Sequence, residues 1–150
     1  SGVVQKISDS SGEEQTPDDI WKAFDQEYLS AKTPYEFVEH QTRADTHASE
    51  KRLMTAKIRK SGVDVIIEGS GNGPIDAYVD ALKKDSGKDI KVFSYSEHSV
   101  GGGSDATAIA FVEAEVDGEH LYGIGQDPNI VSASLIAITC AVNRAIGHGE

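Results

Sequence analysis

Apolar and polar residues alternate along one stretch of this chain, and a helical pattern follows it. Residues 52–59 alternate, a Ser-Gly pair at 61–62 predicts a tight hairpin turn, and the β-branched segment 63–68 predicts the returning strand. The glycine-rich segment 69–73 is typical of a loop. The apolar residues that follow recur at helical spacing, which predicts a helix over residues 74–84.

The second half of the chain repeats this order. Strand patterns cover residues 90–96 and 106–116, an Asp-Gly turn follows, and a third strand leads into a second glycine-rich segment, 123–127. Asn129 is placed to cap a helix whose apolar period runs to about Gly147. The turns and the helix alanines recur after 56 residues, whereas the glycines recur after 54. We therefore expect the second strand-to-helix connection to be two residues longer.

A weak strand pattern over residues 35–46 completes the first half, so the order is βββα followed by βββα. Antiparallel strands with a helix returning over one face predict an α+β fold. The duplication predicts two βββα units related by a pseudo-twofold axis, with helices packed on antiparallel strands. Two similar helix starts would then be available to bind small anions such as carboxylates.

Charge and composition narrow the range of partners. The chain has 150 residues and a formal net charge of −11, with 25 acidic and 14 basic side chains. A protein that neutralises phosphates needs the opposite balance, which disfavours nucleic acid and anionic membrane surfaces as partners. No apolar run reaches transmembrane length and no signal peptide is recognisable, so we expect a cytoplasmic protein. The single cysteine, Cys140, lies on an apolar helical pattern and is interpreted as a core residue.

The sequence contains no recognisable catalytic or metal-binding pattern. The segment 69–73 lacks the lysine of a phosphate loop and the glycine spacing of a dinucleotide site. Glu97 and His98 are neighbours on a strand and point to opposite faces, so we interpret them as exposed polar residues rather than as one cluster. The histidines have no ligand spacing, which predicts no metal site and no catalysis. Segment 99–105 is either a loop that closes over a ligand or a linker. The residues alone thus predict a duplicated domain that binds a small anionic metabolite.

Five sequence blocks resemble the C-terminal regulatory domain of 2-isopropylmalate synthase, and they occur in that family's order over roughly residues 35–147. They are Gly71-Asn72-Gly73-Pro74-Ile75-Asp76-Ala77, Tyr95-Ser96-Glu97-His98, Gly103-Ser104-Asp105-Ala106, Gly123-Ile124-Gly125 with Ala133-Ser134-Leu135, and Ala141-Val142-Asn143-Arg144. The resemblance implies that residues 34–150 form a regulatory ligand-binding domain. It also implies that residues 1–33 are the end of a linker subdomain, with a strand end plus one helix.

The family's activity is implied by the same resemblance. The parent enzyme would be an acyltransferase that condenses acetyl-CoA with 2-oxoisovalerate, the first committed step of leucine biosynthesis. Its catalytic barrel, which would hold a divalent metal, is absent from this chain, so no catalysis and no cofactor are expected in the fragment itself. The domain would bind leucine and inhibit the catalytic domain of the same parent chain, within a homodimer.

The resemblance also implies a leucine-binding set. Helix-start amides would receive the carboxylate, apolar and small side chains would hold the branched side chain, and loop carbonyls would accept from the ammonium group. The set comprises Gly71, Gly73, Ile75, Asp76, Val92, Tyr95, Ser99, Ala106, Ala108, Pro128 and Ile130.

Two other functions are also consistent with the sequence. One is the isoleucine-sensing domain of citramalate synthase, because a hydrophobic pocket discriminates the position of one methyl group only modestly. The other is a dimerisation module without a ligand. The sequence also leaves open whether both copies of the repeat bind ligand and whether the fragment dimerises alone. If the copies are unequal, the copy over residues 71–76 is the expected binding copy.

Overall fold

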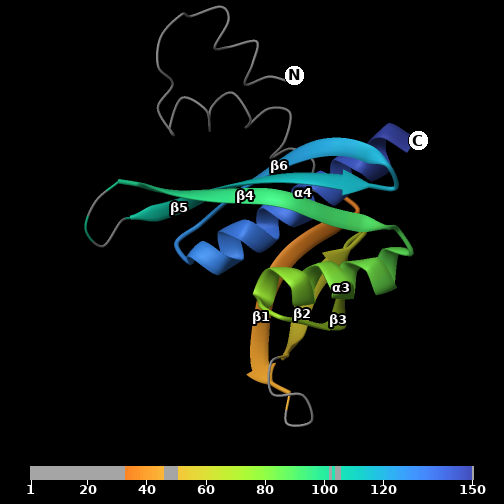
Figure 1. The fold of residues 1–150 in the computed structure, drawn as a ribbon, viewed down its shortest axis with the longest axis horizontal. Coiled ribbons are helices and arrows are strands. Elements are labelled where there is room, and N and C mark those ends of the chain that lie inside the picture. Colours follow the sequence, from red (N-terminus) through yellow and green to blue (C-terminus); the bar gives the residue numbers. More distant parts are fainter. Residues whose placement is uncertain (1–32, 46–50, 102, 104–105, 150) are drawn as a thin grey trace, which may run out of the picture.

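The computed structural model describes residues 33–45, 51–101, 103 and 106–149, and this part of the chain forms two three-stranded sheets with one helix each (Figure 1). The predicted α+β fold of two βββα units is confirmed. The strand end and the helix expected within residues 1–33 lie outside the described residues. In chain order the elements are β1 (Tyr35–Ala44), β2 (Arg52–Lys60), β3 (Val63–Gly71), α3 (Pro74–Ser86), β4 (Ile90–Val100), β5 (Thr107–Val116), β6 (Glu119–Asp127) and α4 (Ile130–Gly149).

The two sheets have the same topology and nearly the same register. Each is antiparallel, with the orders β1-β2-β3 and β4-β5-β6. The first strand of each sheet carries one bulge, between Phe37 and Glu39 in β1 and between Val92 and Ser94 in β4. The duplication therefore extends to an irregularity that the sequence pattern did not reveal.

Both predicted hairpin turns are present. Ser61 and Gly62 have φ values of 51° and 86°, and Asp117 and Gly118 have φ values of 49° and 86°. Two successive positive φ values are those of the turn that matches the right-handed twist of the flanking strands. The Ser-Gly and Asp-Gly pairs thus set the register of β2 with β3 and of β5 with β6.

The glycine-rich segments belong largely to strands rather than to loops, which corrects the sequence interpretation. Gly69 lies within β3 and Gly125 within β6, and each faces a helix. A Cβ on Gly69 would stand 2.5 Å from the backbone nitrogen of Ala81, and one on Gly125 would stand 2.6 Å from that of Ala137. Glycine is needed at these positions because the helix backbone crosses the strand too closely for any side chain.

These contacts also correct the expected difference in connection length. Gly69 and Gly125 make equivalent helix contacts and are 56 residues apart, the same interval as the turns and the helix alanines. The strand-to-helix connections are residues 72–73 and 128–129, so they have equal length. The interval of 54 compared glycines that are not equivalent.

Several elements extend beyond their predicted ends. Helix α3 continues to Ser86, where Gly87 adopts the left-handed conformation (φ 72°) and its N–H donates to the Lys83 carbonyl. Helix α4 passes Gly147 and continues to Gly149. Strand β4 runs to Val100, so Ser99 belongs to the strand and not to a loop.

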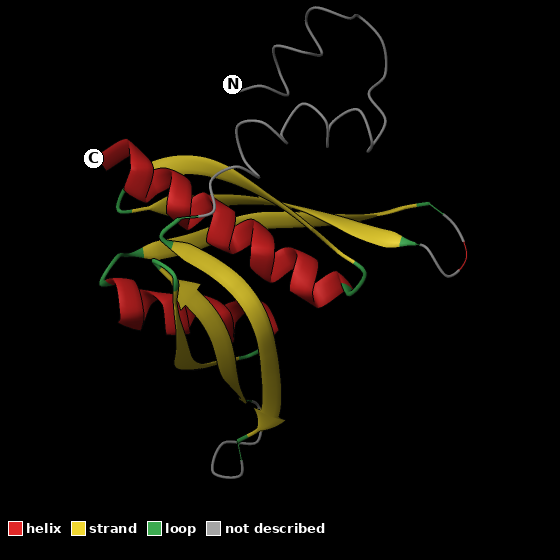
Figure 2. Ribbon diagram, turned by 180° about the vertical axis from the view of Figure 1, so that it is seen from behind, coloured by secondary structure: helices red, strands yellow, loops and turns green. Residues whose placement is uncertain are grey.

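The core lies between each sheet and its helix (Figure 2). Alternate residues of the central strands point inward, among them Ala56 and Ile58 in β2 and Ala110 and Val112 in β5. Cys140 is also buried, as predicted, and burial raises the pKa of its thiol to about 11. A large apolar side chain such as that of Ile58 or Val112 contributes roughly 1.5–3 kcal/mol to the free energy of unfolding when it is fully buried.

Helix α4 is the more apolar of the two described helices. Among the described residues it is the one helix with the length and composition of a membrane span, over Ile130–His148, and 61% of that stretch is buried inside the domain. The core helix of a globular domain has the same composition. The packing of α4 against β5 and β6 accounts for its apolar character.

Two buried polar contacts join the units across α4. The side-chain amide of Asn143 accepts from the Tyr35 backbone N–H (3.0 Å) and donates to the Tyr35 carbonyl (2.7 Å). The Tyr78 hydroxyl of α3 lies 2.7 Å from the Thr139 hydroxyl of α4. These bonds hold β1 and α3 of the first unit against the helix of the second unit.

Candidate functional site

A cavity of about 500 Å³ opens where the start of α3, the middle of β4 and the start of α4 meet. This volume is within the range of small-molecule sites. The wall from α3 contains Gly73, Pro74, Ile75 and Asp76, the wall from β4 contains Val92, Phe93, Ser94, Tyr95 and Glu97, and α4 contributes Val131 and Ser134. Both repeats therefore contribute to one cavity.

The start of α3 is open on the side of the cavity. Its N-cap, Gly73, is extended and offers no side chain, and Pro74 occupies the first helical position. The first backbone N–H that bonds back into the helix is that of Ala77, which donates to the Gly73 carbonyl (3.0 Å). The N–H groups of Ile75 and Asp76 therefore have no partner within the helix. Together with the helix dipole they form a site suited to a carboxylate.

The walls of the cavity combine apolar and polar side chains. Ile75, Val92 and Val131 are partly buried apolar residues that pack against the core. Beside them the Ser134 hydroxyl donates to Glu97 Oε1 at 2.8 Å. Such a mixture suits a small ligand that has both an aliphatic part and charged groups.

Glu97 is half-buried in the cavity wall, which corrects its interpretation as an exposed strand residue. The prediction that Glu97 and His98 point to opposite faces is confirmed. His98 lies against Phe111 on the other face of the sheet, with ring centroids 5.6 Å apart. The two residues therefore serve different surfaces.

The structure brings some of the predicted ligand residues together and leaves others apart. Gly73, Ile75, Asp76, Val92 and Tyr95 line the cavity. Gly71 lies directly behind it, where a Cβ would stand 2.6 Å from the Cβ of Asp76. Outside the lining are Ser99, which pairs with Ala108 across β4 and β5, the buried Ala108 itself, the exposed Ala106 before β5, and the exposed Pro128 and Ile130 at the start of α4.

Sequence reasoning missed six lining residues, namely Pro74, Phe93, Ser94, Glu97, Val131 and Ser134. One signal was available for Glu97, because it stands two residues after Tyr95 and so shares its face of the strand. No local signal identified Ser134, since its role depends on how α4 packs against β4.

The equivalent helix start in the second unit is closed by the protein's own polar groups. The Asn129 side chain accepts from the Ser132 N–H (2.9 Å), which caps α4 as predicted. Asp127, the counterpart of Gly71, accepts from the Asn129 N–H (2.8 Å) through its carboxylate. The second helix start thus already has an anion and a cap.

The counterpart of the cavity is filled by aromatic side chains. Tyr78 occupies the repeat position of Ser134, and Phe37 occupies that of Val92. Their rings are in edge contact, with centroids 5.9 Å apart, and Tyr78 is fully buried. Near them, burial lowers the pKa of His40, partly opposed by the Asp127 charge. The two copies of the repeat therefore differ, since one has a cavity and the other is filled by side chains.

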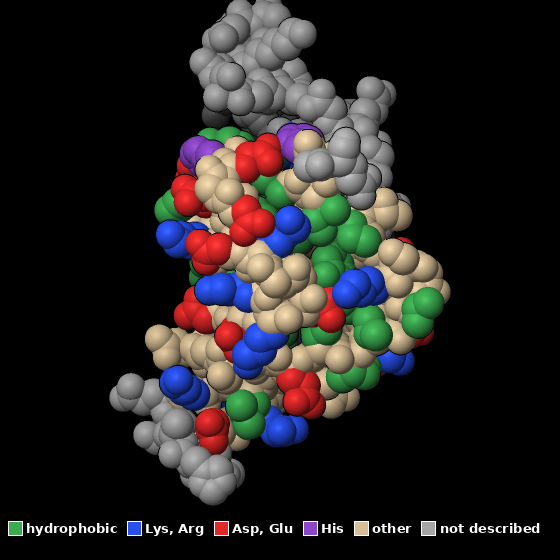
Figure 3. Space-filling view, turned by 90° about the vertical axis from the view of Figure 1, so that its right-hand side faces the viewer, with side chains coloured by type: hydrophobic (Ala, Val, Ile, Leu, Met, Phe, Trp, Pro, Cys, Tyr) green, Lys and Arg blue, Asp and Glu red, His purple; other side chains and the backbone are tan. Residues whose placement is uncertain are grey.

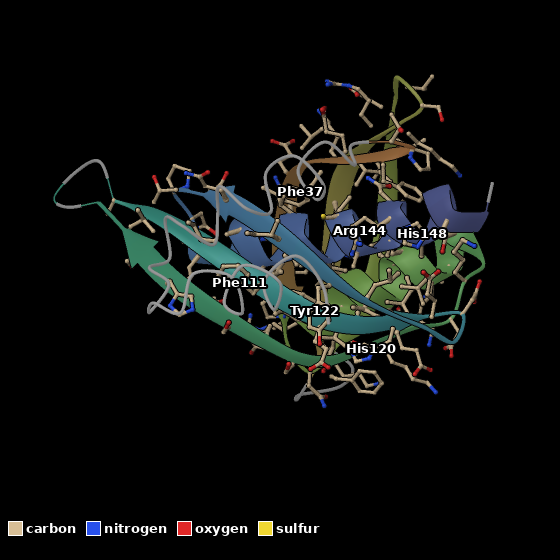
Figure 4. All side chains as sticks on the ribbon, turned by 90° about the horizontal axis from the view of Figure 1, so that it is seen from above. Phe37, Phe111, His120, Tyr122, Arg144 and His148 are labelled. Atoms are coloured by element: carbon tan, nitrogen blue, oxygen red, sulfur yellow. The ribbon has the colours of Figure 1, made fainter. Side chains whose placement is uncertain are left out.

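The outer faces of the two sheets also differ. The outer face of the first sheet is charged, with Arg59 paired to Glu36 and Asp64. The outer face of the second sheet carries aromatic and histidine side chains. Figure 4 shows Phe111, Tyr122 and His120 on this face, seen from above. His120 forms a 2.6 Å contact with Glu113 there.

Neither a metal-binding group among the described residues nor a basic surface on the face shown in Figure 3 is present. Among the described residues no group of three His, Cys, Asp or Glu side chains is placed to hold a metal ion. On the face shown in Figure 3, Lys and Arg side chains are interspersed with Asp and Glu and form no continuous basic surface. The cavity therefore remains the candidate site.

Comparison with known proteins gives a consistent result. The profile of the LeuA allosteric (dimerisation) domain matches residues 14–146. The chain is 49% identical over 145 residues to a 2-isopropylmalate synthase of Rhodospirillum rubrum, covering 96% of the chain and 26% of the relative. Relatives of the same name in Brucella suis (43% over 145 residues; 96% and 26% covered) and Mycobacterium leprae (40% over 146 residues; 97% and 24% covered) are also similar. The chain thus spans about a quarter of the length of the curated relatives it matches.

Proposed function

The chain belongs to the LeuA allosteric (dimerisation) domain family, and from this membership we propose that it is the leucine-sensing regulatory domain of a 2-isopropylmalate synthase. The names of its relatives support this assignment, and so does the share of their length that it covers. Condensation of acetyl-CoA with 2-oxoisovalerate would belong to the remainder of the parent chain. The domain itself would bind the end product and carry out no chemistry.

The observation that carries the proposal is the open start of α3 at one wall of a cavity with apolar and polar walls. The leucine carboxylate would accept from the N–H groups of Ile75 and Asp76, where the helix dipole also favours negative charge. The branched side chain would pack against Ile75, Val92 and Val131. Leucine would thereby be bound through both its carboxylate and its apolar side chain.

We further propose that the domain acts as a homodimer whose second copy covers the open side of the cavity. Phe93 and Tyr95 line the cavity, yet they are 56% and 54% exposed in the single chain. Exposed rings at the rim of a binding cavity are typical of an interface. Leucine would inhibit by binding one state of the dimer better than another, and that difference in affinity would set the degree of inhibition.

Isothermal titration of the 150-residue chain with leucine and with isoleucine tests the proposal, with light scattering to establish the oligomeric state. We expect saturable binding of leucine that is tighter than binding of isoleucine. If isoleucine binds more tightly, the domain is an isoleucine sensor. If neither amino acid binds to a folded dimer, the domain is a dimerisation module without a ligand and the proposal is wrong.

A further inference from the structure

We propose that Glu97 is the residue that recognises the ammonium group of the amino-acid effector. The cavity would then select zwitterionic amino acids over simple carboxylates of the same shape. This inference rests on the proposed function and adds to it a determinant of specificity. Loop carbonyls, which the sequence suggested as acceptors for the ammonium group, would be secondary to a carboxylate.

The charge of the cavity points to a cationic group on the ligand. Two carboxylates line it, Asp76 from α3 and Glu97 from β4, and none of its lining residues is a lysine, arginine or histidine. A ligand with a carboxylate alone would meet two negative charges and receive only backbone N–H groups. A ligand that also carries an ammonium group would neutralise one of those charges.

Glu97 lacks the partner that a half-buried carboxylate normally has. Its Oε1 accepts from the Ser134 hydroxyl, and within the described ranges no cationic side chain forms an ion pair with it. By contrast, the half-buried Asp85 is 3.0 Å from the Lys60 ammonium group. Removing a carboxylate from water without a cation costs free energy, and an ammonium group from the ligand would offset that cost.

Asp76 is the weaker candidate because its charge is already stabilised. It is exposed to solvent and lies in the first turn of α3, where the helix dipole favours an anion. Glu97 lies on a different wall, on the face of β4 that it shares with Tyr95. The carboxylate and the ammonium group of one amino acid can therefore meet different elements, the start of α3 and the middle of β4.

Ser134 acts as a positioning residue in this arrangement. It is fully buried, and its hydroxyl holds one oxygen of Glu97 at 2.8 Å. A carboxylate fixed by one oxygen loses less conformational freedom when the other oxygen binds a ligand. The bond also joins β4 to α4, so a ligand that binds Glu97 would be linked to both elements.

The test compares leucine with 4-methylpentanoate, which has the same carboxylate and side chain but no amine. Affinities are measured by isothermal titration on the 150-residue chain and on Glu97→Gln. We expect the unmodified chain to prefer leucine by at least about tenfold, and Glu97→Gln to lose roughly 10- to 100-fold in affinity for leucine and little for 4-methylpentanoate. Glu115→Gln is the matched control, because it removes the same charge from the face of β5 that points away from α4, and it should keep the preference.

Each other outcome is informative. If Glu97→Gln keeps the preference for leucine, or if Asp76→Asn loses it instead, the role of Glu97 is overturned while leucine binding stands. If the unmodified chain binds neither leucine nor 4-methylpentanoate, the proposed function is wrong, and the proposed role of Glu97 falls with it. Should Glu97→Gln not fold, as judged by circular dichroism, Ser134→Ala replaces it. That variant should weaken leucine binding more than 4-methylpentanoate binding, and equal weakening of both would overturn the proposal.

Discussion

Two glycines near the cavity differ in the space around them, although they stand only two residues apart. Gly71 lies at the end of β3, where a Cβ would stand 2.8 Å from the Ala77 backbone nitrogen as well as close to Asp76. A Cβ on Gly73 would meet nothing within 4 Å, and its backbone is extended. The missing side chain of Gly71 allows α3 to start close beside β3. The missing side chain of Gly73 leaves the start of the helix open.

Gly71→Ala should therefore displace the first turn of α3. We expect it to lower the free energy of unfolding by about 1–3 kcal/mol and to weaken leucine binding. Gly73→Ala is the matched control and should cost less than about 1 kcal/mol, because it meets no neighbour and changes only the N-cap residue. Urea denaturation followed by circular dichroism measures both. Equal losses for the two variants would contradict the role assigned to Gly71.

At this scale the sequence predicted residues whose chemistry is local. Asn129 caps α4 through its own side chain, and Cys140 is buried as its helical pattern indicated. Glu97 was misread because its environment is made by Ser134, which lies 37 positions away in the chain. No local pattern contains that contact.

The strand–helix crossings are the feature that sets the distance between elements. The strands approach so closely at Gly69 and Gly125 that the helix backbone occupies the place of a Cβ. The helices present alanines there, Ala77 and Ala81 in α3 and Ala133 and Ala137 in α4. Glycine on the strand and alanine on the helix thus form a packing device that both units share, and the second unit repeats it at Gly123 against Ala137 and Ala141.

Gly69→Ala and Gly125→Ala should each push a helix away from its sheet. We expect each to lower the free energy of unfolding by about 3 kcal/mol, since neither neighbour is a flexible side chain that could move aside. Gly147→Ala lies in α4 with open space around it and should instead raise stability by about 0.5–1 kcal/mol. Thermal and chemical denaturation of the three variants checks the order. A tolerated Gly69→Ala would show that α3 is not held at this distance.

Element types were predictable, but the ends of several elements were not. The Ser-Gly and Asp-Gly turns and the apolar periods gave the correct order of strands and helices. The glycines were read as loops because glycine marks a turn and a close backbone contact alike, and only tertiary packing distinguishes the two. Ser99 was placed in a loop for a similar reason, since its pairing with Ala108 is not visible in its neighbours.

For the whole molecule, the inequality of the two halves bears on how many ligands the domain would bind under the proposed function. The cavity uses the open start of α3, whereas the counterpart position holds Asp127, Asn129, Phe37 and Tyr78. The sequence repeat suggested two similar anion sites. The residues that fill the second position lie in β1, α3, the end of β6 and the connection to α4, so their combined effect appears only when the units are packed together.

Titration should accordingly give one leucine per chain. Isothermal calorimetry with the chain concentration fixed by ultraviolet absorbance measures this ratio directly, and a thermal shift that rises with leucine concentration provides an independent readout. A ratio of two per chain would show that the Phe37–Tyr78 contact opens to admit a second ligand and would contradict the assignment of a single site.

The Asn143–Tyr35 contact has a consequence for how the chain reaches this structure. It joins positions 108 residues apart, so it encloses almost the entire described chain. Closing so long a segment costs chain entropy before any contact is gained, and folds dominated by such contacts form slowly. A break between α3 and β4 would separate Tyr35 from Asn143 and leave the backbone groups of β1 without these partners. The two units are thus copies in architecture, yet each supplies one partner of these bonds, so neither half alone would contain them.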